Sequence, residues 1–158
     1  MRITTLNCNG IRSAQRKGLY EWLPKQDLDV LCLQETRCCD ADLEVEHFRP
    51  KGWHHEWLHA TTKKGYSGVG LYSRRPPDKV IRGFGSKEFD PEGRYLELQF
   101  GKLSVVSLYL PSGSSSPERQ LAKFRFLAEF MPYLESLRKK RRHYVLCGDW
   151  NIAHKEID

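Results

Sequence analysis

Short apolar runs alternate with polar segments that carry Gly, Pro, Asn or Asp, a pattern typical of strands joined by turns and helices. Two compact apolar runs, residues 29–34 and 144–147, predict strands buried on both faces of a sheet. Further strands are predicted at residues 2–8, 53–60, 68–73, 80–84, 94–100 and 103–110. Residues 101–102 form a two-residue hairpin candidate between the last two strands.

Apolar residues three or four positions apart predict helices at residues 13–23, 40–48 and from Ser116 onward. Ser116 is the expected N-cap of the longest helix, and Pro117 and Glu118 suit its first turn. One buried stripe is predicted on this helix: Leu121, Phe124, Leu127, Met131, Leu134 and Leu137. Pro132 predicts a kink. The basic run 139–142 predicts a solvated helix end, with DNA contact as the alternative.

Strands mixed with helices predict one α/β (α+β) domain over residues 1–158. The 26 Lys and Arg against 20 Asp and Glu give a net charge of +6, which suits a polyanionic partner such as nucleic acid and many ordinary soluble proteins as well. A hydrophobic fraction of 39% excludes a disordered chain. No apolar run reaches the roughly 18 residues of a membrane helix, and the N-terminus lacks a signal sequence, so we expect a cytoplasmic protein.

Five cysteines are present, and three of them (Cys8, Cys32 and Cys147) fall in or beside apolar strands. The vicinal pair Cys38-Cys39 has no second Cys/His pair at zinc-like spacing. We therefore expect reduced thiols and no zinc site.

Polar side chains follow four of the apolar strands: Asn7 and Asn9, Gln34 and Glu35, Tyr109, and Asp149 and Asn151. If those strands lie together, their ends converge on one rim, where α/β folds usually bind ligands. Carboxylate and carboxamide oxygens suit Mg²⁺ or Mn²⁺. Taken singly, each residue also has a structural explanation as a strand cap, a turn residue or a packing aromatic.

Six strings occur in an order that resembles the exodeoxyribonuclease III type of apurinic/apyrimidinic endonuclease, within the endonuclease/exonuclease/phosphatase superfamily. They are LNCNGIR at 6–12, LQETR at 33–37, YSGVG at 66–70, GRY at 93–95, LYLPSG at 108–113 and GDWNIAH at 148–154. The resemblance runs along the whole chain. It implies a four-layer α/β sandwich and Mg²⁺-dependent hydrolysis of DNA phosphodiesters, with Mn²⁺ as the alternative metal. It also implies 3′-to-5′ exonuclease action on duplex DNA and incision 5′ to abasic sites.

The resemblance also implies roles for individual residues. Glu35 is similar to the principal metal ligand, with Asn7 and the further candidate Asn9 completing the metal shell. Asp149 resembles the group that activates water, Asn151 the amide that donates to the phosphate and holds Asp149, and both belong to the expected metal set. Tyr109 resembles the phenol directed at the scissile phosphate. Arg94, Tyr66 and Ser67 are expected to contact the DNA backbone.

Members of that family are longer than this chain, and their C-terminal part carries a further buried Asp and a closing Ser/Asn-Asp-His motif that is absent here. We therefore expect the N-terminal part of the domain and weak or no activity of the isolated chain. Two explanations stay open: a truncated gene product or fragment, or a second chain that supplies the missing half. The alternatives are a non-catalytic DNA-binding remnant or subunit, and a phosphodiesterase of the same superfamily that acts on another substrate, such as inositol phosphates.

Overall fold

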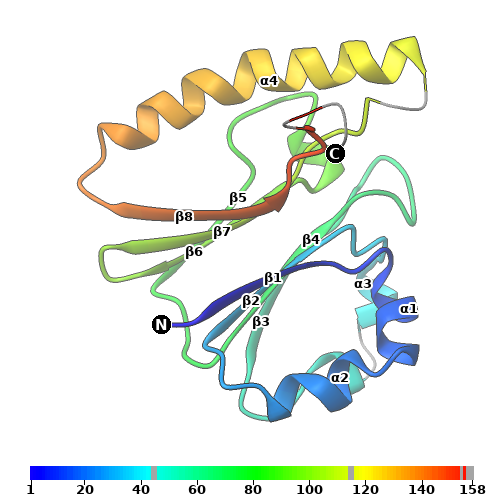
Figure 1. Cartoon of the computed structure of the whole chain (residues 1–158), viewed down its shortest axis with the longest axis vertical. Coiled ribbons are helices and arrows are strands. Elements are labelled where there is room, and N and C mark those ends of the chain that lie inside the picture. Colours follow the sequence, from blue (N-terminus) through cyan, green and yellow to red (C-terminus); the bar gives the residue numbers. More distant parts are fainter. Residues whose placement is uncertain (44–45, 114–115, 154, 156–158) are drawn as a thin grey trace.

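The computed structural model describes residues 1–43, 46–113, 116–153 and 155, and shows two stacked β-sheets with helices on their outer faces (Figure 1). This four-layer arrangement confirms the predicted α/β sandwich. Within the described ranges, no helix combines the length and the apolar composition that crossing a bilayer requires.

The first sheet has the strand order β1-β2-β4-β3. Its strands are β1 (Ile3–Asn7), β2 (Val30–Gln34), β3 (His54–Leu58) and β4 (Val69–Ser73). β1 runs parallel to β2, and the other two pairs are antiparallel. Three short helices lie on its outer side: α1 (Ile11–Arg16), α2 (Leu19–Trp22) and α3 (Asp40–Leu43), with the 3₁₀ turns η1 (Leu23–Lys25) and η2 (Glu46–Phe48).

The second sheet has the order β5-β6-β7-β8. Its strands are β5 (Lys79–Arg82), β6 (Tyr95–Phe100), β7 (Leu103–Tyr109) and β8 (His143–Asp149), and the 3₁₀ turn η3 (Asp90–Glu92) precedes β6. Phe100 pairs with Leu103, which confirms the predicted two-residue hairpin. The long helix α4 (Pro117–Arg138) covers the outer face and connects β7 to the parallel strand β8 (Figure 1).

Each sheet therefore has one parallel pair at one side, β1 with β2 and β8 with β7. β1 and β8 lie next to each other and run in the same direction (Figure 1). Because parallel strands end on the same side, the carboxyl ends of all four strands meet at one rim of the sandwich. The predicted convergence of the strand ends is thus a property of the fold.

Side-chain alternation along the strands creates three apolar layers. In β2, Leu31 and Leu33 face the short helices, whereas Val30 and Cys32 face the second sheet. In β7, Val105 faces the first sheet, and the next residue, Val106, packs on the other face with Phe126 and Phe130 of α4. A strand buried on both faces has no polar side to show in its sequence, which explains the continuous apolar runs.

The predicted helix at residues 13–23 is two helices in the structure. α1 ends before Lys17, and Gly18 has φ 90°, a left-handed conformation that favours glycine and redirects the chain into α2. Trp22, the last residue of α2, is 39% exposed. Of the predicted helix 40–48, the structure shows only α3 and η2, and residues 44–45 lie outside the described ranges.

Helix α4 begins as predicted, because the Ser116 hydroxyl accepts a hydrogen bond from the Arg119 amide. Its predicted buried stripe is wrong at three of six positions, whereas Leu127, Leu134 and Leu137 do pack. Leu121, Phe124 and Met131 are more than half exposed. The fully buried residues of the helix are Leu137 and two residues outside the predicted stripe, Phe126 and Phe130. Both sets recur at helical spacing, so periodicity alone did not select the face that packs.

Candidate active site

Six of the nine predicted site residues line one cavity of about 420 Å³ at the shared rim of the two sheets. Glu35 comes from the end of β2, Tyr109 from the end of β7, and Asp149 and Asn151 from the end of β8. The complete lining is Glu35, Arg37, Lys63, Gly65, Tyr66, Ser67, Tyr109, Ser112, Arg119, Asp149 and Asn151.

Asp149 is held in one orientation by contacts at both carboxylate oxygens. Its Oδ2 accepts a hydrogen bond from Asn7 Nδ2 at 2.7 Å, and its Oδ1 accepts one from the Asn151 backbone amide at 3.0 Å. Its backbone pairs with Tyr109 across the parallel strands. Asn7 and Asp149 belong to different sheets and are 142 residues apart in sequence. The contact therefore fixes the two sheets relative to each other at the rim.

Glu35 has an unusual backbone conformation that neighbouring segments stabilise on both sides. Its φ is 58°, its carbonyl accepts from the Gly10 amide at 2.7 Å, and the next amide, of Thr36, donates to the Gly68 carbonyl. A Cβ on Gly68 would lie 2.4 Å from the Thr36 hydroxyl, so only glycine allows this approach. The Glu35 side chain is 13% exposed and forms an ion pair with Arg37. Strained residues of this kind concentrate at functional sites.

Tyr109 and Glu35, which come from different sheets, line the same cavity. Burial, together with the negative charge of Glu35, raises the pKa of Tyr109 to about 12. The nearby Arg94 lowers this pKa but does not cancel the rise. Tyr109 is therefore a neutral phenol at physiological pH and can donate a hydrogen bond.

Arg94 does not lie where a direct DNA contact requires. Only 2% of it is exposed, and its guanidinium hydrogen-bonds Glu92, the Tyr109 carbonyl and the Tyr66 hydroxyl. A side chain enclosed in this way cannot reach a phosphate without leaving its partners, and a DNA contact of Arg94 stays a prediction. Tyr66 is partly exposed at the cavity. Ser67 is buried, with φ 51°.

The three asparagines differ in position. Asn151 lines the cavity and donates through Nδ2 to the Leu110 carbonyl at 2.9 Å. Asn7 reaches the cavity through Asp149. Asn9 is exposed and lies outside the lining, and its amide donates to Asn7 Oδ1 at 3.0 Å. Asn9 therefore supports Asn7 rather than facing the cavity.

Three cations that were not among the predicted site residues line the cavity: Arg37, Lys63 and Arg119. Lys63 and Arg119 stand over the Tyr66 ring at 5.4 and 5.7 Å from its centre. Arg37 also borders an adjoining cavity of about 370 Å³, which Arg12 and Arg16 of α1 line as well. Arg37 follows directly on the Gln-Glu-Thr string, so that signal was available in the sequence. Lys63 and Arg119 are ordinary loop and helix positions whose proximity only the fold creates.

The donor set of the cavity fits a hard divalent cation. Glu35 and Asp149 supply carboxylate oxygens, and Asn151 adds an amide oxygen. Across the part of the chain that the structure describes, no group of three His, Cys, Asp or Glu side chains is arranged around a common point. Each of the five cysteines is a free thiol, as predicted.

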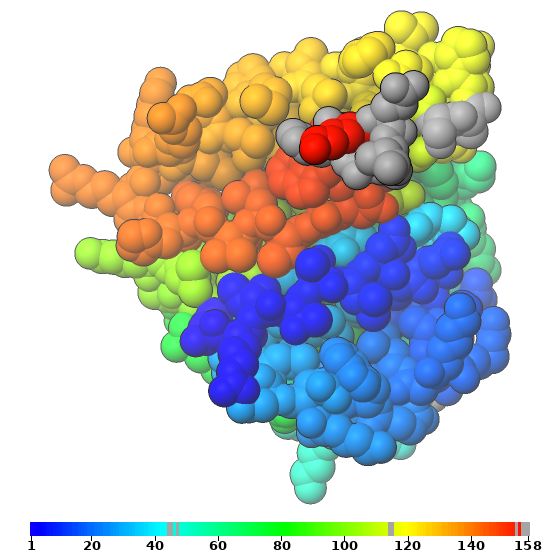
Figure 2. Space-filling view, in the orientation of Figure 1, coloured from blue at the N-terminus to red at the C-terminus, as the bar shows by residue number. Residues whose placement is uncertain are grey.

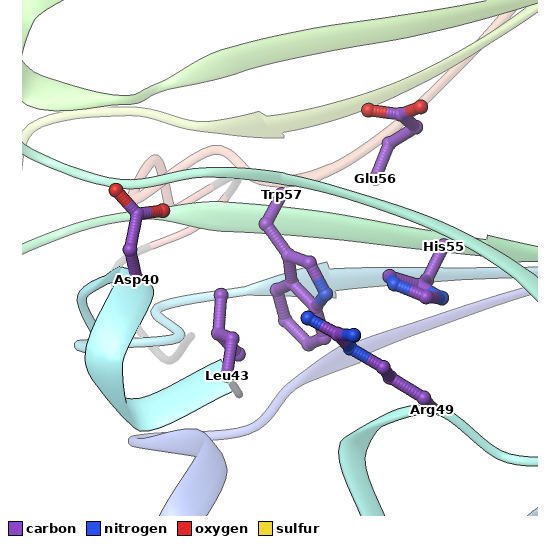
Figure 3. Close-up of a pocket in the computed structure, with 6 residues that line it drawn as sticks. All are labelled: Asp40, Leu43, Arg49, His55, Glu56 and Trp57. Atoms are coloured by element: carbon purple, nitrogen blue, oxygen red, sulfur yellow. The ribbon is translucent and has the colours of Figure 1, made fainter. Parts of the chain in front are cut away.

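A second cavity, of about 350 Å³, lies between α3 and β3 and is shown in Figure 3. Its lining residues are Asp40, Leu43, Arg49, His55, Glu56 and Trp57. Asp40 and Glu56 stand well apart in the view, and Glu56 is ion-paired with Arg82. Burial and the charge of Arg49 lower the pKa of His55. The cavity brings no two carboxylates together, so we do not assign the chemistry to it.

Comparison with known proteins identifies the family of this chain. Residues 4–158 match the Endonuclease/Exonuclease/phosphatase family. The chain is 36% identical over 159 residues to an exodeoxyribonuclease of Bacillus subtilis and 37% identical over 159 residues to DNA repair nuclease APEX1 of Danio rerio. It covers 61% and 51% of the lengths of those two proteins, and all of this chain is matched in both comparisons.

Solved structures give the same result. An AP endonuclease from Archaeoglobus fulgidus superimposes with a TM-score of 0.82 at 30% identity, over 100% of this chain and 60% of that one. A 3′-5′ exonuclease from Neisseria meningitidis also gives a TM-score of 0.82, at 26% identity over 97% of this chain and 59% of that one. The chain thus spans about half to three fifths of the length of these four proteins.

Proposed function

This chain belongs to the Endonuclease/Exonuclease/phosphatase family, and we propose that it carries the metal-binding and water-activating side of a DNA-repair nuclease that hydrolyses phosphodiester bonds. One observation supports this most directly. The hydrogen bond between Asn7 and Asp149 joins the two sheets at the cavity that also holds Glu35 and Tyr109. The proposed substrate is duplex DNA with abasic sites or 3′ ends, as the names of the relatives suggest.

We propose Mg²⁺ as the cofactor, held by Glu35 with Asn7, and with Asp149 and Asn151 in its immediate surroundings. Bound there, the ion supplies positive charge next to the phosphate oxygens and lowers the cost of the developing negative charge. Glu35 is mostly buried, and Arg37 is the cation paired with it. The mostly buried Glu35 carboxylate shares the cavity with the Asp149 carboxylate, and two such negative charges favour the binding of a further cation.

Asp149 is the proposed acceptor for the proton of the attacking water. Asn7 and Asn151 fix both carboxylate oxygens, so Asp149 does not need to reorient when the water arrives. Tyr109 stays protonated at neutral pH and is the proposed hydrogen-bond donor to the scissile phosphate. The Asn151 side-chain amide has a second N–H for the same phosphate, because a carboxamide nitrogen carries two donors.

The cations around the cavity suit the DNA backbone. Lys63 and Arg119 border the catalytic cavity, and Arg37 connects it to the neighbouring cavity lined by Arg12 and Arg16. This gives a row of positive side chains from the first turn of α4 to α1. Such a row neutralises successive phosphates without reading sequence, as a repair enzyme requires.

We propose that a second polypeptide segment completes this site by pairing with the edges of β1 and β8. These two neighbouring strands border the rim, and Figure 2 shows their segments side by side on the surface. β1 has no charged side chain, and β8 has only His143 and its last residue, Asp149. By contrast, β3 and β5 at the opposite edges carry Glu56, Lys79 and Arg82. Charged edges discourage strand addition, and uncharged edges permit it. Leu6 and Val145 on β1 and β8 are both 37% exposed.

Incision of an end-labelled abasic duplex in the presence of Mg²⁺ tests the proposal. We expect slow incision by the chain alone, and faster incision when the part of the Bacillus subtilis relative that this chain does not cover is added as a separate polypeptide. Asp149→Ala should abolish both activities. Efficient turnover by the chain alone that Asp149→Ala abolishes would keep the nuclease assignment and remove the need for a second segment.

Two other outcomes would replace the proposal. Salt-sensitive DNA binding that needs no divalent metal, with no incision under either condition, would make the chain a DNA-binding subunit. Competition by a phosphoinositide that outweighs an equal amount of abasic duplex would indicate a phosphodiesterase with another substrate.

A further inference from the structure

We infer that Arg94 acts as a positioning residue, which orients the hydroxyl group of Tyr66 toward the substrate phosphate and holds the backbone of Tyr109 at the cavity, without touching the DNA itself. This inference rests on the proposed function. It replaces the direct phosphate contact that the sequence suggested.

The enclosure of Arg94 carries the inference. Its side chain is 2% exposed and is ion-paired with Glu92, whose own side chain is 24% exposed. Its guanidinium lies 5.2 Å from the centre of the Tyr109 ring and 5.5 Å from the centre of the Tyr66 ring. A buried guanidinium whose charge is paired and whose nitrogens are engaged is a fixed part of the scaffold.

The contact with Tyr66 sets the direction of a hydrogen bond. Arg94 Nη2 lies 2.9 Å from the Tyr66 hydroxyl oxygen. A guanidinium donates only, so the phenol oxygen must accept, and its own proton is free to point elsewhere. Tyr66 lines the catalytic cavity. The hydroxyl proton is thereby available for an anionic oxygen in that cavity.

Arg94 makes two hydrogen bonds with the backbone of Tyr109. Arg94 Nη1 donates to the Tyr109 carbonyl at 3.0 Å, and the Tyr109 amide donates to the Arg94 carbonyl at 3.0 Å. The two residues therefore hold each other at the end of β7, where the phenol enters the cavity. A displacement of about 1 Å at such a point can cost on the order of 100-fold in rate.

Arg94 thus differs from Arg119, which lies over the same tyrosine ring. Arg119 is exposed at the start of α4, and its guanidinium is 5.7 Å from the centre of the Tyr66 ring. We assign phosphate contact to Arg119 and positioning to Arg94. The two residues form a matched pair for experiment, because they carry the same side chain near the same aromatic ring.

The salt dependence of DNA binding separates the two roles. Each neutralised phosphate contributes about 0.9 to the slope of log affinity against log salt. Arg119→Ala should lower the slope by about that amount. Arg94→Lys, which keeps the charge but loses the fork of donors, should weaken binding about 10-fold and leave the slope unchanged. A slope reduced by Arg94→Met as much as by Arg119→Ala would overturn the inference.

A double-mutant cycle with Tyr66→Phe provides the second readout. If Arg94 acts through the Tyr66 hydroxyl, Arg94→Lys should cost clearly less affinity in the Tyr66→Phe background than in the wild type. Fully additive losses would contradict the inference. Circular dichroism melts verify that each variant is folded. If Arg94→Met does not fold, Arg94→Lys and the double-mutant cycle still test the positioning role of Arg94. Failure of the wild type to bind DNA with salt dependence would remove the proposed function as well, whereas normal wild-type binding with additive variants removes this inference alone.

Discussion

Two cavities of similar size differ in what they can do. The cavity at the rim measures about 420 Å³ and the one between α3 and β3 about 350 Å³. Each contains a glutamate paired with an arginine, Glu35 with Arg37 in the first and Glu56 with Arg82 in the second. The rim cavity draws its side chains from both sheets, whereas the second is built around β3 and the segment that includes α3.

The backbone distinguishes the two cavities further. Five non-glycine residues of the described chain have positive φ. Four of them line the rim cavity (Glu35, Arg37, Ser67 and Asn151), and the fifth, Asn9, hydrogen-bonds with Asn7. Each such residue costs on the order of 1–3 kcal/mol and persists only where the surroundings enforce it. The lining of the second cavity contains none of them. The two cavities are therefore alike in volume and in their charged residues. They differ in that only the rim cavity is lined by residues that the surrounding structure holds in strained backbone conformations.

The largest difference should appear in catalysis. Asp149→Ala removes the carboxylate that Asn7 and Asn151 hold, and the rate of single-turnover incision should fall by about 10²–10³-fold. His55→Ala changes the other cavity and should leave the rate unchanged. Incision of labelled abasic duplex by excess protein, with and without added Mg²⁺, measures both. An unchanged rate in Asp149→Ala would place the chemistry elsewhere.

The free energy of unfolding should instead depend on a residue of the second cavity. Trp57 packs edge-on against Tyr72 with ring centres 5.3 Å apart, and its ring lies where a Cβ on Gly70 would stand. Trp57→Ala should lower the free energy of unfolding by about 2 kcal/mol, because it leaves a hole beside the first sheet. Urea unfolding checks this, with Trp22→Ala, at a 39% exposed position, as the milder control. Equal losses in the two variants would show that the second cavity has no packing role.

Metal affinity gives the next test. Glu35→Gln should weaken Mn²⁺ binding at least 10-fold, because it replaces a charged oxygen ligand by a neutral one. Glu56→Gln is the matched control, since Glu56 has an arginine partner as Glu35 has. Electron paramagnetic resonance of free Mn²⁺ measures both affinities without requiring activity. Equal affinity in the two variants would exclude Glu35 as the principal ligand.

The smallest effect should be a pH dependence at the second cavity. Burial and the charge of Arg49 lower the pKa of His55 in the folded state, so the unfolded chain binds this proton more readily. The contribution of His55 to stability should be complete above its unfolded pKa of about 6.5 and should be lost as the pH falls. Melting temperatures at pH 5 and pH 7.5 should therefore differ less in His55→Gln than in the wild type. An identical difference would show that His55 does not contribute.

Much of the fold could be predicted from local patterns. The double-sided apolar run of β2, the two-residue hairpin before β7 and the Ser116 N-cap all depend on neighbours in sequence, and the structure confirms them. The polar residues at the strand ends could be named as candidates for the same reason. Their roles as metal ligands and water activator remain predictions, which the experiments above test.

The amino-acid sequence by itself determined which segments form strands and helices and which polar side chains end the strands, because these choices depend on spacing and on turn residues. Only the tertiary structure decided which face of α4 packs, because that helix is apolar on two sides and the sheet selects Phe126 and Phe130 over Leu121 and Phe124. The tertiary structure also decided that Arg94 is enclosed, since its three partners come from different segments of the chain. Burial is a property of all the neighbours of a side chain, and a linear pattern contains only those that are close in sequence.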